Sequence, residues 1–388
     1  MHGLAAVDAI GGSGVDELGK QETIRTPANY SAWCGDPRAQ KATTHMQLTD
    51  GGVETIFMSE IDHILSGLTA MQPTISHVYL YDDRGTHLYE QITQTEEYYP
   101  TRTELALIAA QATEIATFPP GVPMLDSQVI CELGAGDGHK TMVLLMAAAK
   151  RAHQTVYLPI DVSQAALNAN VAAFERERLG GDGSAVRVDP LCGRYETCLP
   201  LVRSLPGTKT FLFLGSSIGN YDQAGSIALL QLVQAQMGRG DRLLLGVDTP
   251  HGTQKPVEVI IAAYNDAAGL TAAFTLNALR HLNATAGFNF DWENGWRHVA
   301  VYDEAAEAIV THAEAVGPQV VSRGEGVGSQ HPVRSFAAGE RIFVEQSRKF
   351  SMLTIRQMAA AAGLTVRRHW CATKDWHMIV EMVRGEPE

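Results

Sequence analysis

Residues 128–138 read QVICELGAGDG, an apolar run that ends in three glycines separated by single residues. The apolar part is typical of a buried strand, and the next segment, HKTMVLLMAAAKRA at 139–152, has the composition of a helix. Glycines at such a turn adopt dihedral angles that other residues avoid, and they let a ligand come close to the backbone. The stretch therefore predicts a strand, a ligand-binding loop and a helix in succession.

The same alternation of strand and helix continues toward the C-terminus. Strands are predicted at 156–163, 185–195, 210–221 and 242–249, and helices at 165–179 and 226–237. Such units recur about every 30 residues, as in proteins with a parallel sheet that is covered by helices on both faces. The expected fold class is therefore α/β, with a doubly wound sheet.

The flanking segments have a different pattern. Helical spacing is visible at 53–68 and 256–284, short strands are expected at 296–304, 307–315 and 341–347, and a helix with two strands is expected at 352–383. These segments predict a second, discontinuous domain beside the doubly wound one.

We expect the doubly wound domain to comprise residues 103–250 and 350–388. Residues 50–102 and 251–349 would then form the second domain, which we expect to bind the substrate. Residues 1–49 show no clear period, and we expect a loosely ordered extension there.

Composition excludes several classes of function. The chain has 388 residues and a net charge of −13, whereas nucleic acids and anionic membranes bind basic surfaces, so neither partner is expected. No apolar run approaches the roughly 20 residues that span a bilayer, and no secretory signal is recognisable. The five cysteines form no C-x-x-C pair, so no metal site is predicted and a reduced, cytoplasmic location fits best.

The glycine pattern narrows the class of ligand. It reads G-x-G-x-G, whereas the dinucleotide fingerprint reads G-x-G-x-x-G, and it lacks the lysine-serine pair of a Walker motif. The pattern therefore favours a nucleoside without a phosphate. Asp161 ends the next predicted strand, 27 residues after Gly134, where a carboxylate can accept both ribose hydroxyls. Two other interpretations remain open, namely a tight turn without a ligand and an Asp161 that only caps the following helix.

Five ordered blocks extend this pattern over most of the chain. They are YDDRG at 81–85 with QIT at 91–93 and EYYPTRTE at 97–104, ELGAGDGHKT at 132–141, FLGSSIGN at 213–220, AYNDAAGLTAAFTLNAL at 263–279, and FAAGERIFVEQSRKF at 336–350. Together they resemble the histidine-specific methyltransferases, enzymes that trimethylate the α-amine of L-histidine to hercynine for ergothioneine biosynthesis. The resemblance implies a class I methyltransferase fold and S-adenosylmethionine as the cofactor.

The resemblance also implies a set of cofactor contacts. They fall on Tyr81, Gly134, Lys140, Asp161, Arg194, Tyr195, Gly215 and Ser216. One position departs from the family, in which an Asp-Phe pair meets the adenine. Here the pair reads Arg194-Tyr195, so the aromatic ring is kept but the acceptor for the adenine amino group is lost, because a guanidinium only donates.

The implied contacts with the amino-acid substrate lie on other segments. They are Tyr98, Asn220, Tyr264, Glu345, Gln346 and Ser347. Glu345 and Ser347 are two positions apart, so on a strand they face the same side, where a carboxylate and a hydroxyl can bond the two imidazole nitrogens. A methionine that lies beside the imidazole in the family corresponds to Thr311 here, so the preference for the side chain can differ.

Simpler structural roles compete with these assignments. Tyr98 and Tyr264 can be core aromatics, Asn220 can cap a turn, and Glu345 with Ser347 can be solvent-facing strand residues. His139, His298 and His377 have no carboxylate partner that the sequence identifies, and we assign none of them as a base.

The leading hypothesis is an S-adenosylmethionine-dependent α-N-methyltransferase that converts L-histidine to its Nα-trimethyl betaine. Tyr81 and Tyr264 are the candidate catalytic residues, because either can accept a hydrogen bond from the attacking amine. The alternatives are the same chemistry on tryptophan or a tryptophan derivative, a nicotinamide-dependent oxidoreductase, and a cofactor-binding module without activity. The number of methyl transfers and the oligomeric state are left open.

Overall fold

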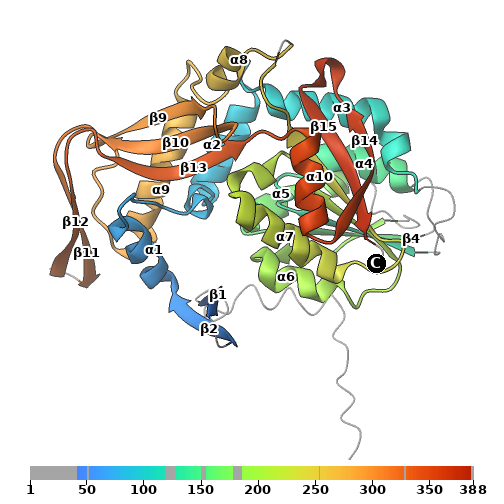
Figure 1. Cartoon of the computed structure of the whole chain (residues 1–388), viewed down its shortest axis with the longest axis horizontal. Coiled ribbons are helices and arrows are strands. Elements are labelled where there is room, and N and C mark those ends of the chain that lie inside the picture. Colours follow the sequence, from blue (N-terminus) through green and yellow to red (C-terminus); the bar gives the residue numbers. More distant parts are fainter. Residues whose placement is uncertain are drawn as a thin grey trace, which may run out of the picture.

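The structure is a computed structural model. It describes residues 60–118, 127–149, 154–177, 186–252, 254–324 and 331–385 with their side chains, and the backbone of 42–49, 52–59, 325–326 and 329–330. Figure 1 shows two parts side by side, a large sheet with helices around it and a smaller region that contains β9, β10 and β13.

The large sheet has eight strands. They are β3 (Ser127–Leu133), β4 (Gln154–Asp161), β5 (Val186–Val188), β6 (Leu191–Cys192), β7 (Thr208–Phe213), β8 (Arg242–Asp248), β14 (Leu364–Cys371) and β15 (His377–Arg384). The order is β14-β15-β8-β7-β3-β4-β5, with β6 paired to β4. Strands β3, β4, β5, β7 and β8 pair in parallel, whereas β15 runs antiparallel to both of its neighbours. The predicted α/β fold with a doubly wound sheet is confirmed.

Helices cover both faces of this sheet. They are α3 (Tyr99–Ile115), α4 (His139–Ala149), α5 (Gln164–Arg176), α6 (Tyr195–Val202), α7 (Gln223–Gln236) and α10 (Met352–Ala361). Alternate residues of a strand point to opposite faces. Cys131 and Phe211 accordingly join the apolar cluster that includes α6, α7 and α10, and Ile130 and Leu212 join the cluster that includes α3, α4 and α5. The central strands are buried on both sides, as in other parallel sheets.

The smaller region combines an antiparallel sheet with helices. Its elements are α1 (Glu60–Thr69), α2 (Asp83–Thr93), α8 (Val257–Ala262), α9 (Leu270–Ala286), β9 (Trp296–Asp303), β10 (Ala308–Ala315), β13 (Arg341–Arg348), and the hairpin of β11 (Gln319–Gly326) and β12 (Ser329–Phe336). The sheet has the order β13-β10-β9. A third apolar cluster joins these elements and contains Leu68, Phe274, Ile309 and Val344.

Three features of this region differ from the sequence prediction. Residues 52–59, expected to be helical, form β2 (Gly52–Ser59) paired with β1 (Ala42–Thr49), and α1 begins only at Glu60. The helix expected at 256–284 is interrupted between α8 and α9. Gly269, in the left-handed conformation, is the N-cap of α9, and the Asp266 carboxylate accepts the N–H groups of Leu270 and Thr271 in its first turn. The hairpin of β11 and β12 was not predicted.

We propose the division into domains that the sequence suggests, with 103–250 and 350–388 in one and 50–102 and 251–349 in the other. The separate apolar clusters support it, although α3 crosses the boundary at residue 103. The extension at 1–49 lies outside the described residues, apart from the backbone of β1. No helix in the described ranges is long and apolar enough to cross a membrane.

Candidate active site

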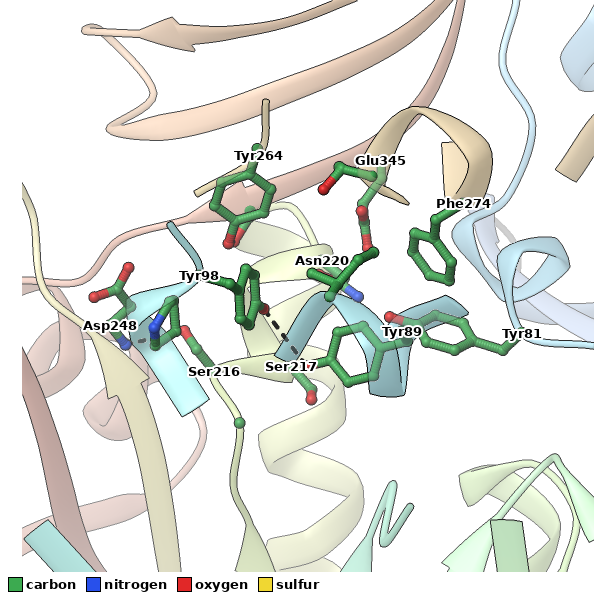
Figure 2. A pocket seen from close by; sticks show the side chains of 15 residues that line it. Tyr81, Tyr89, Tyr98, Ser216, Ser217, Asn220, Asp248, Tyr264, Phe274 and Glu345 are labelled. Atoms are coloured by element: carbon green, nitrogen blue, oxygen red, sulfur yellow. Dashed lines mark hydrogen bonds between the residues drawn. The ribbon is translucent and has the colours of Figure 1, made fainter. Parts of the chain in front are cut away.

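A pocket lies where the carboxyl ends of β7 and β8 meet the smaller region. It encloses about 570 Å³ of space, part of which is open to solvent. Figure 2 shows the side chains that converge on it from both parts of the chain. The lining residues are Tyr81, Tyr89, Ile92, Tyr98, Pro100, Gly215, Ser216, Ser217, Asn220, Asp248, Tyr264, Thr271, Phe274, Glu345 and Ser347.

The backbone of the glycine loop adopts a conformation that suits glycine, and it is hydrogen-bonded to the carboxylate of Asp161. Gly134, Gly136 and Gly138 have φ values of 65°, 53° and 72°, which side-chain-bearing residues rarely adopt. The N–H of Gly136 donates to one carboxylate oxygen of Asp161 at 3.0 Å, and the N–H of Ser163 donates to the other at 2.9 Å. Ser163, not Asp161, caps α5. Asp161 therefore connects the loop to the end of β4, where the sequence predicted it.

Buried polar groups support the loop from below. Glu132 accepts hydrogen bonds from the hydroxyls of Thr141 and Tyr157, and Asn170 donates to the carbonyl of Gly136 at 3.3 Å. Burial raises the pKa of Glu132 to about 7, against the effect of its two hydrogen bonds. This network fixes the loop in one conformation.

The residues present fit a nucleoside. A Cβ on Gly134 would lie 2.8 Å from the hydroxyl of Tyr195, so a glycine at this position lets the Tyr195 ring pack against the loop. The ring of Tyr195 packs edge-on against Phe213 at 5.9 Å, and burial raises its pKa well above the ordinary value. Burial also raises the pKa of Asp161. An aromatic ring, a carboxylate and a glycine-rich loop suit a base and a ribose.

Arg194, the position that departs from the family, faces the smaller region. Its guanidinium lies 3.7 Å from the carboxylate of Glu60, at the start of α1. The hydroxyl of Tyr79 donates to the same carboxylate at 3.1 Å. Arg194 is thus part of a contact between the two parts of the chain, which the sequence did not predict.

Gly215 and Ser216 form a strained turn at the end of β7. Their φ values are 76° and 59°, and Ser216 is a residue type that seldom adopts the left-handed conformation. The turn is fixed from two sides. The hydroxyl of Ser216 accepts the N–H of Asp248 at 3.0 Å, and the N–H of Gly215 donates to the carboxylate of Glu104 at 2.9 Å.

Glu104 is the centre of a buried charge cluster behind this turn. It is fully buried and receives Lys140 at 2.6 Å and His377 at 3.0 Å. Burial alone would raise the pKa of Glu104, but the charge of Lys140 outweighs it and holds the pKa well below its ordinary value. Lys140, predicted to contact the cofactor, therefore has a carboxylate partner that the sequence did not reveal.

Aromatic side chains form one wall of the pocket (Figure 2). The ring of Tyr81 lies edge-on to Phe274 at 5.2 Å and to Tyr89 at 6.0 Å, and the ring of Tyr98 lies edge-on to Tyr264 at 5.9 Å. Burial raises the pKa of Tyr81 and of Tyr98 well above the ordinary value. Both phenols are therefore neutral at physiological pH. Tyr89 and Phe274 were not predicted as site residues.

Polar groups from β13 form the opposite wall. Glu345 and Ser347 both line the pocket, as their spacing on one strand predicts, whereas Gln346 between them does not. Adjacent residues of a strand point to opposite faces, which explains why Gln346 is excluded. Burial raises the pKa of Glu345 to about 7, although the charge of Lys349 opposes this.

A buried lysine connects Ser347 with Tyr264. The ammonium of Lys349 lies 3.0 Å from each hydroxyl and 3.0 Å from the carboxylate of Asp248. Its side chain has no exposed surface. Asp248 also accepts Lys255 at 2.7 Å and the hydroxyl of Tyr99 at 2.6 Å. Lys349 was not predicted as a site residue. It directly follows the last residue of β13, Arg348, so the alternation of side chains along the strand does not reach it.

The predicted residues thus fall into two adjoining groups. Tyr81, Tyr98, Gly215, Ser216, Asn220, Tyr264, Glu345 and Ser347 line the pocket. Gly134, Lys140, Asp161, Arg194 and Tyr195 lie outside its lining, along the carboxyl ends of β3, β4 and β6. A cofactor along the sheet edge and a small substrate in the pocket are the arrangement that this geometry suits.

Comparisons with known proteins give this arrangement a family. A family model described as "Histidine-specific methyltransferase, SAM-dependent" matches residues 60–384. Histidine N-alpha-methyltransferase of Mycobacterium tuberculosis is 33% identical over 307 residues, which cover 79% of this chain and 89% of that protein. Ergothioneine biosynthesis protein 1 of Neurospora crassa is 31% identical over 75% of this chain, but the match covers only 31% of that longer relative.

A more distant relative has another substrate in its name. The L-tryptophan methyltransferase of Psilocybe serbica is 25% identical, over 78% of this chain and 86% of its own length. The family model nevertheless spans the glycine loop, the pocket and both walls described above. The chain therefore belongs to the histidine-specific methyltransferase family, and it is a methyltransferase that uses S-adenosylmethionine.

Proposed function

We propose that this enzyme methylates the α-amine of L-histidine and converts it to the Nα-trimethyl betaine, hercynine. The observation that carries the proposal is the pair of Glu345 and Ser347 on one face of β13, at the pocket wall. An imidazole carries two ring nitrogens, and a carboxylate with a hydroxyl on one strand face is chemically matched to them. The name of the relative with 33% identity, histidine N-alpha-methyltransferase, supports the same substrate.

Residues along the sheet edge are proposed to hold the cofactor. When bound, S-adenosylmethionine supplies an electrophilic methyl group. Asp161 would accept the ribose hydroxyls while it also orders the glycine loop through Gly136. Tyr195 would pack against the base. Gly215 and Ser216, both in the left-handed conformation, would bring backbone close to the amino-acid part of the cofactor, with Lys140 behind them.

The other end of the substrate is proposed to meet neutral groups. Asn220, Tyr98 and Tyr264 line this part of the pocket, and their amide and phenol groups can hold the substrate's carboxylate and amine by hydrogen bonds. Such a surrounding disfavours the charged form of the amine, because burial without a paired charge lowers the pKa of an amine. The amine must be neutral to attack, so this burial assists the reaction.

Tyr81 and Tyr264 are proposed as the residues that orient the nucleophile. The pKa of Tyr81 is raised by burial and by the charge of Glu345, while a hydrogen bond from Asn220 acts in the opposite direction. A phenol in this state keeps its proton, so its oxygen accepts a hydrogen bond from the amine without removing a proton. The contribution we assign to the chain is positioning and exclusion of water.

Tryptophan is the second candidate substrate. Thr311 pairs directly with Glu345 across β10 and β13 and is buried. The threonine side chain is small. If this position lies beside the substrate ring, a threonine there leaves space for a ring larger than imidazole. The relative named for L-tryptophan gives this candidate a precedent at 25% identity.

Steady-state kinetics separates the two candidates. The purified protein, with S-adenosylmethionine, is offered histidine, tryptophan, tyrosine and phenylalanine, and kcat/KM is measured for each. We expect histidine to be preferred by about 10⁴-fold over phenylalanine, because a pocket built for hydrogen bonds rejects a ring that leaves its groups unpaired. A preference for tryptophan would replace histidine with the second candidate.

A further inference from the structure

The hydroxyls of Tyr264 and Ser347 share a limited number of hydrogen-bonding positions. They lie 2.6 Å apart, so one donates to the other. Each also lies 3.0 Å from the ammonium of Lys349. An ammonium has three donors and no acceptor, and the third donor of Lys349 points to Asp248. Lys349 therefore fills one lone pair on each hydroxyl.

Two arrangements of the hydroxyl hydrogens of Tyr264 and Ser347 fit these contacts. If Tyr264 donates to Ser347, both lone pairs of Ser347 are filled and its own hydrogen is free to enter the pocket. If Ser347 donates to Tyr264, Ser347 keeps one lone pair and has no hydrogen to offer. A phenol is a much stronger acid than an aliphatic hydroxyl and is the better donor in a short bond, so the first arrangement is favoured.

We propose that Lys349 is a positioning residue that makes Ser347 a donor-only hydroxyl, so that the pocket selects the neutral imidazole of histidine. The bare ring nitrogen accepts from Ser347, and the ring N–H donates to Glu345. A protonated imidazolium would have no lone pair for Ser347. An indole would leave Ser347 unmatched, because it has one N–H and no acceptor. The inference rests on the proposed function. It adds which tautomer and which charge state of the imidazole ring the site binds.

The test needs a control for the loss of a buried charge. Lys255 offers one, because it is also buried and also contacts Asp248, at 2.7 Å. Its other polar partner is the carbonyl of Trp376, and it does not line the pocket. Lys349→Met and Lys255→Met each remove one positive charge from the same carboxylate, but only the first frees Tyr264 and Ser347.

The first measurement is the number of protons released when histidine binds at pH 6, by calorimetry in two buffers with different ionisation heats. Wild type selects neutral imidazole and a neutral amine, so it should release protons that the free imidazolium, the α-ammonium of histidine and Glu345 hold at this pH. In Lys349→Met, Ser347 can accept a hydrogen bond and the neighbouring positive charge is gone, so imidazolium is tolerated. We expect about one proton fewer to be released.

Other titratable groups near the hydroxyls are common to wild type and to both lysine variants. They are Tyr81, Tyr89, Tyr98, Tyr99, Asp248, Glu345 and His298, whose ring contacts the backbone carbonyl of Tyr264. The contributions of these groups other than Glu345 cancel when Lys349→Met is compared with Lys255→Met, which should release as many protons as wild type. The charge of Lys349 lowers the pKa of Glu345, so both lysine variants are also compared in a Glu345→Gln background, where the difference in proton release should persist.

The second measurement is the ratio of kcat/KM for histidine to that for tryptophan. We expect Lys349→Met to lower it about 10- to 100-fold, mainly through the KM of histidine, and Lys255→Met to leave it within about threefold. Tyr264→Phe is a second variant for the case in which Lys349→Met does not fold. It removes the donor to Ser347, so it should also reduce proton release.

Each outcome decides the question. Three results would overturn the role of Lys349. They are equal effects of Lys349→Met and Lys255→Met, unchanged proton release in Tyr264→Phe, and a wild type that binds histidine at pH 6 without releasing protons. A wild type that neither binds nor methylates histidine overturns the proposed function itself. Wild type is therefore measured before any variant is made.

Discussion

The hydroxyl oxygens of Tyr264 and Ser347 lie 2.6 Å apart, although 83 residues separate them in the chain. One belongs to the segment between α8 and α9, and the other to β13. The buried ammonium of Lys349 contacts both. The polarity of the substrate pocket is therefore set in part by a charge behind its wall.

Glu345 should lower the stability of the enzyme as pH rises from about 4.5 to about 7. Its pKa is raised from 4.5 to about 7 by burial, so between these values the folded state holds a proton that the unfolded state has released. Stability then falls as pH rises through this window. Glu345→Gln removes the ionisation, and we expect it to be more stable than wild type at pH 8 by about 1–3 kcal/mol.

Chemical denaturation at pH 8 and at pH 5 measures this difference. The gain should shrink toward pH 5. Turnover of histidine should fall because the carboxylate that accepts the ring N–H is replaced by a neutral amide, whose oxygen is a weaker acceptor. Equal stability of the two proteins at pH 8 would show that Glu345 ionises without cost in the free enzyme.

Asp161 should be required for cofactor affinity. Asp161→Ala removes the proposed ribose acceptor and the two backbone hydrogen bonds to Gly136 and Ser163, so we expect S-adenosylmethionine to bind about 10- to 150-fold more weakly. Asp137 is a matched control, since it is an exposed carboxylate in the same loop. Calorimetry on a folded Asp161→Ala that shows the affinity of Asp137→Ala would remove Asp161 from the site.

The pair of Lys140 and Glu104 should stabilise the fold behind the Gly215 turn. Glu104 has a pKa held below 4.5, so its contribution is present above that pH and is lost as pH falls through the folded value. Lys140→Met leaves a buried carboxylate without its strongest partner, and we expect a loss of about 3 kcal/mol at pH 7.

The double variant Lys140→Met with Glu104→Gln tests the cause of that loss. It removes both charges, so a large part of the stability should return. If the double variant is as unstable as Lys140→Met alone, the effect comes from packing and not from the unpaired carboxylate.

Thr311 should limit discrimination against large rings. It lies opposite Glu345 in the β10–β13 register, and Thr311→Met adds volume there. We expect the variant to lower kcat/KM for tryptophan about tenfold or more while it changes that for histidine less. Loss of both activities in parallel would mean that Thr311 lies away from the bound ring.

The fold and much of the site could be predicted because their determinants are local. The glycine spacing after β3 and the alternation of strands with helices are visible within short windows. Glu345 and Ser347 reach the pocket together because a strand presents every second residue on one face. The same rule excludes Gln346, which the resemblance alone had included.

The remaining features depend on contacts between distant residues. Glu104 joins His377 across 273 positions, and Arg194 meets Glu60 through the packing of the two parts. No spacing rule links such pairs. The break between α8 and α9 was not predicted, because the apolar spacing continues through it. The Asp266 carboxylate, which accepts the first N–H groups of α9, leaves no mark on that spacing.

Mass spectrometry with fragmentation of the product shows whether L-histidine is methylated, and whether the methyl groups are on its α-nitrogen. Wild-type protein is incubated with S-adenosylmethionine and an equimolar mixture of histidine, tryptophan, tyrosine and phenylalanine, with Glu345→Ala as the matched variant. With wild type, histidine should gain about 14, 28 and 42 mass units in succession, as one, two and three methyl groups are transferred. With Glu345→Ala, the amount of methylated histidine should fall more than that of any other methylated amino acid. Methylated tryptophan with unmodified histidine would contradict the account.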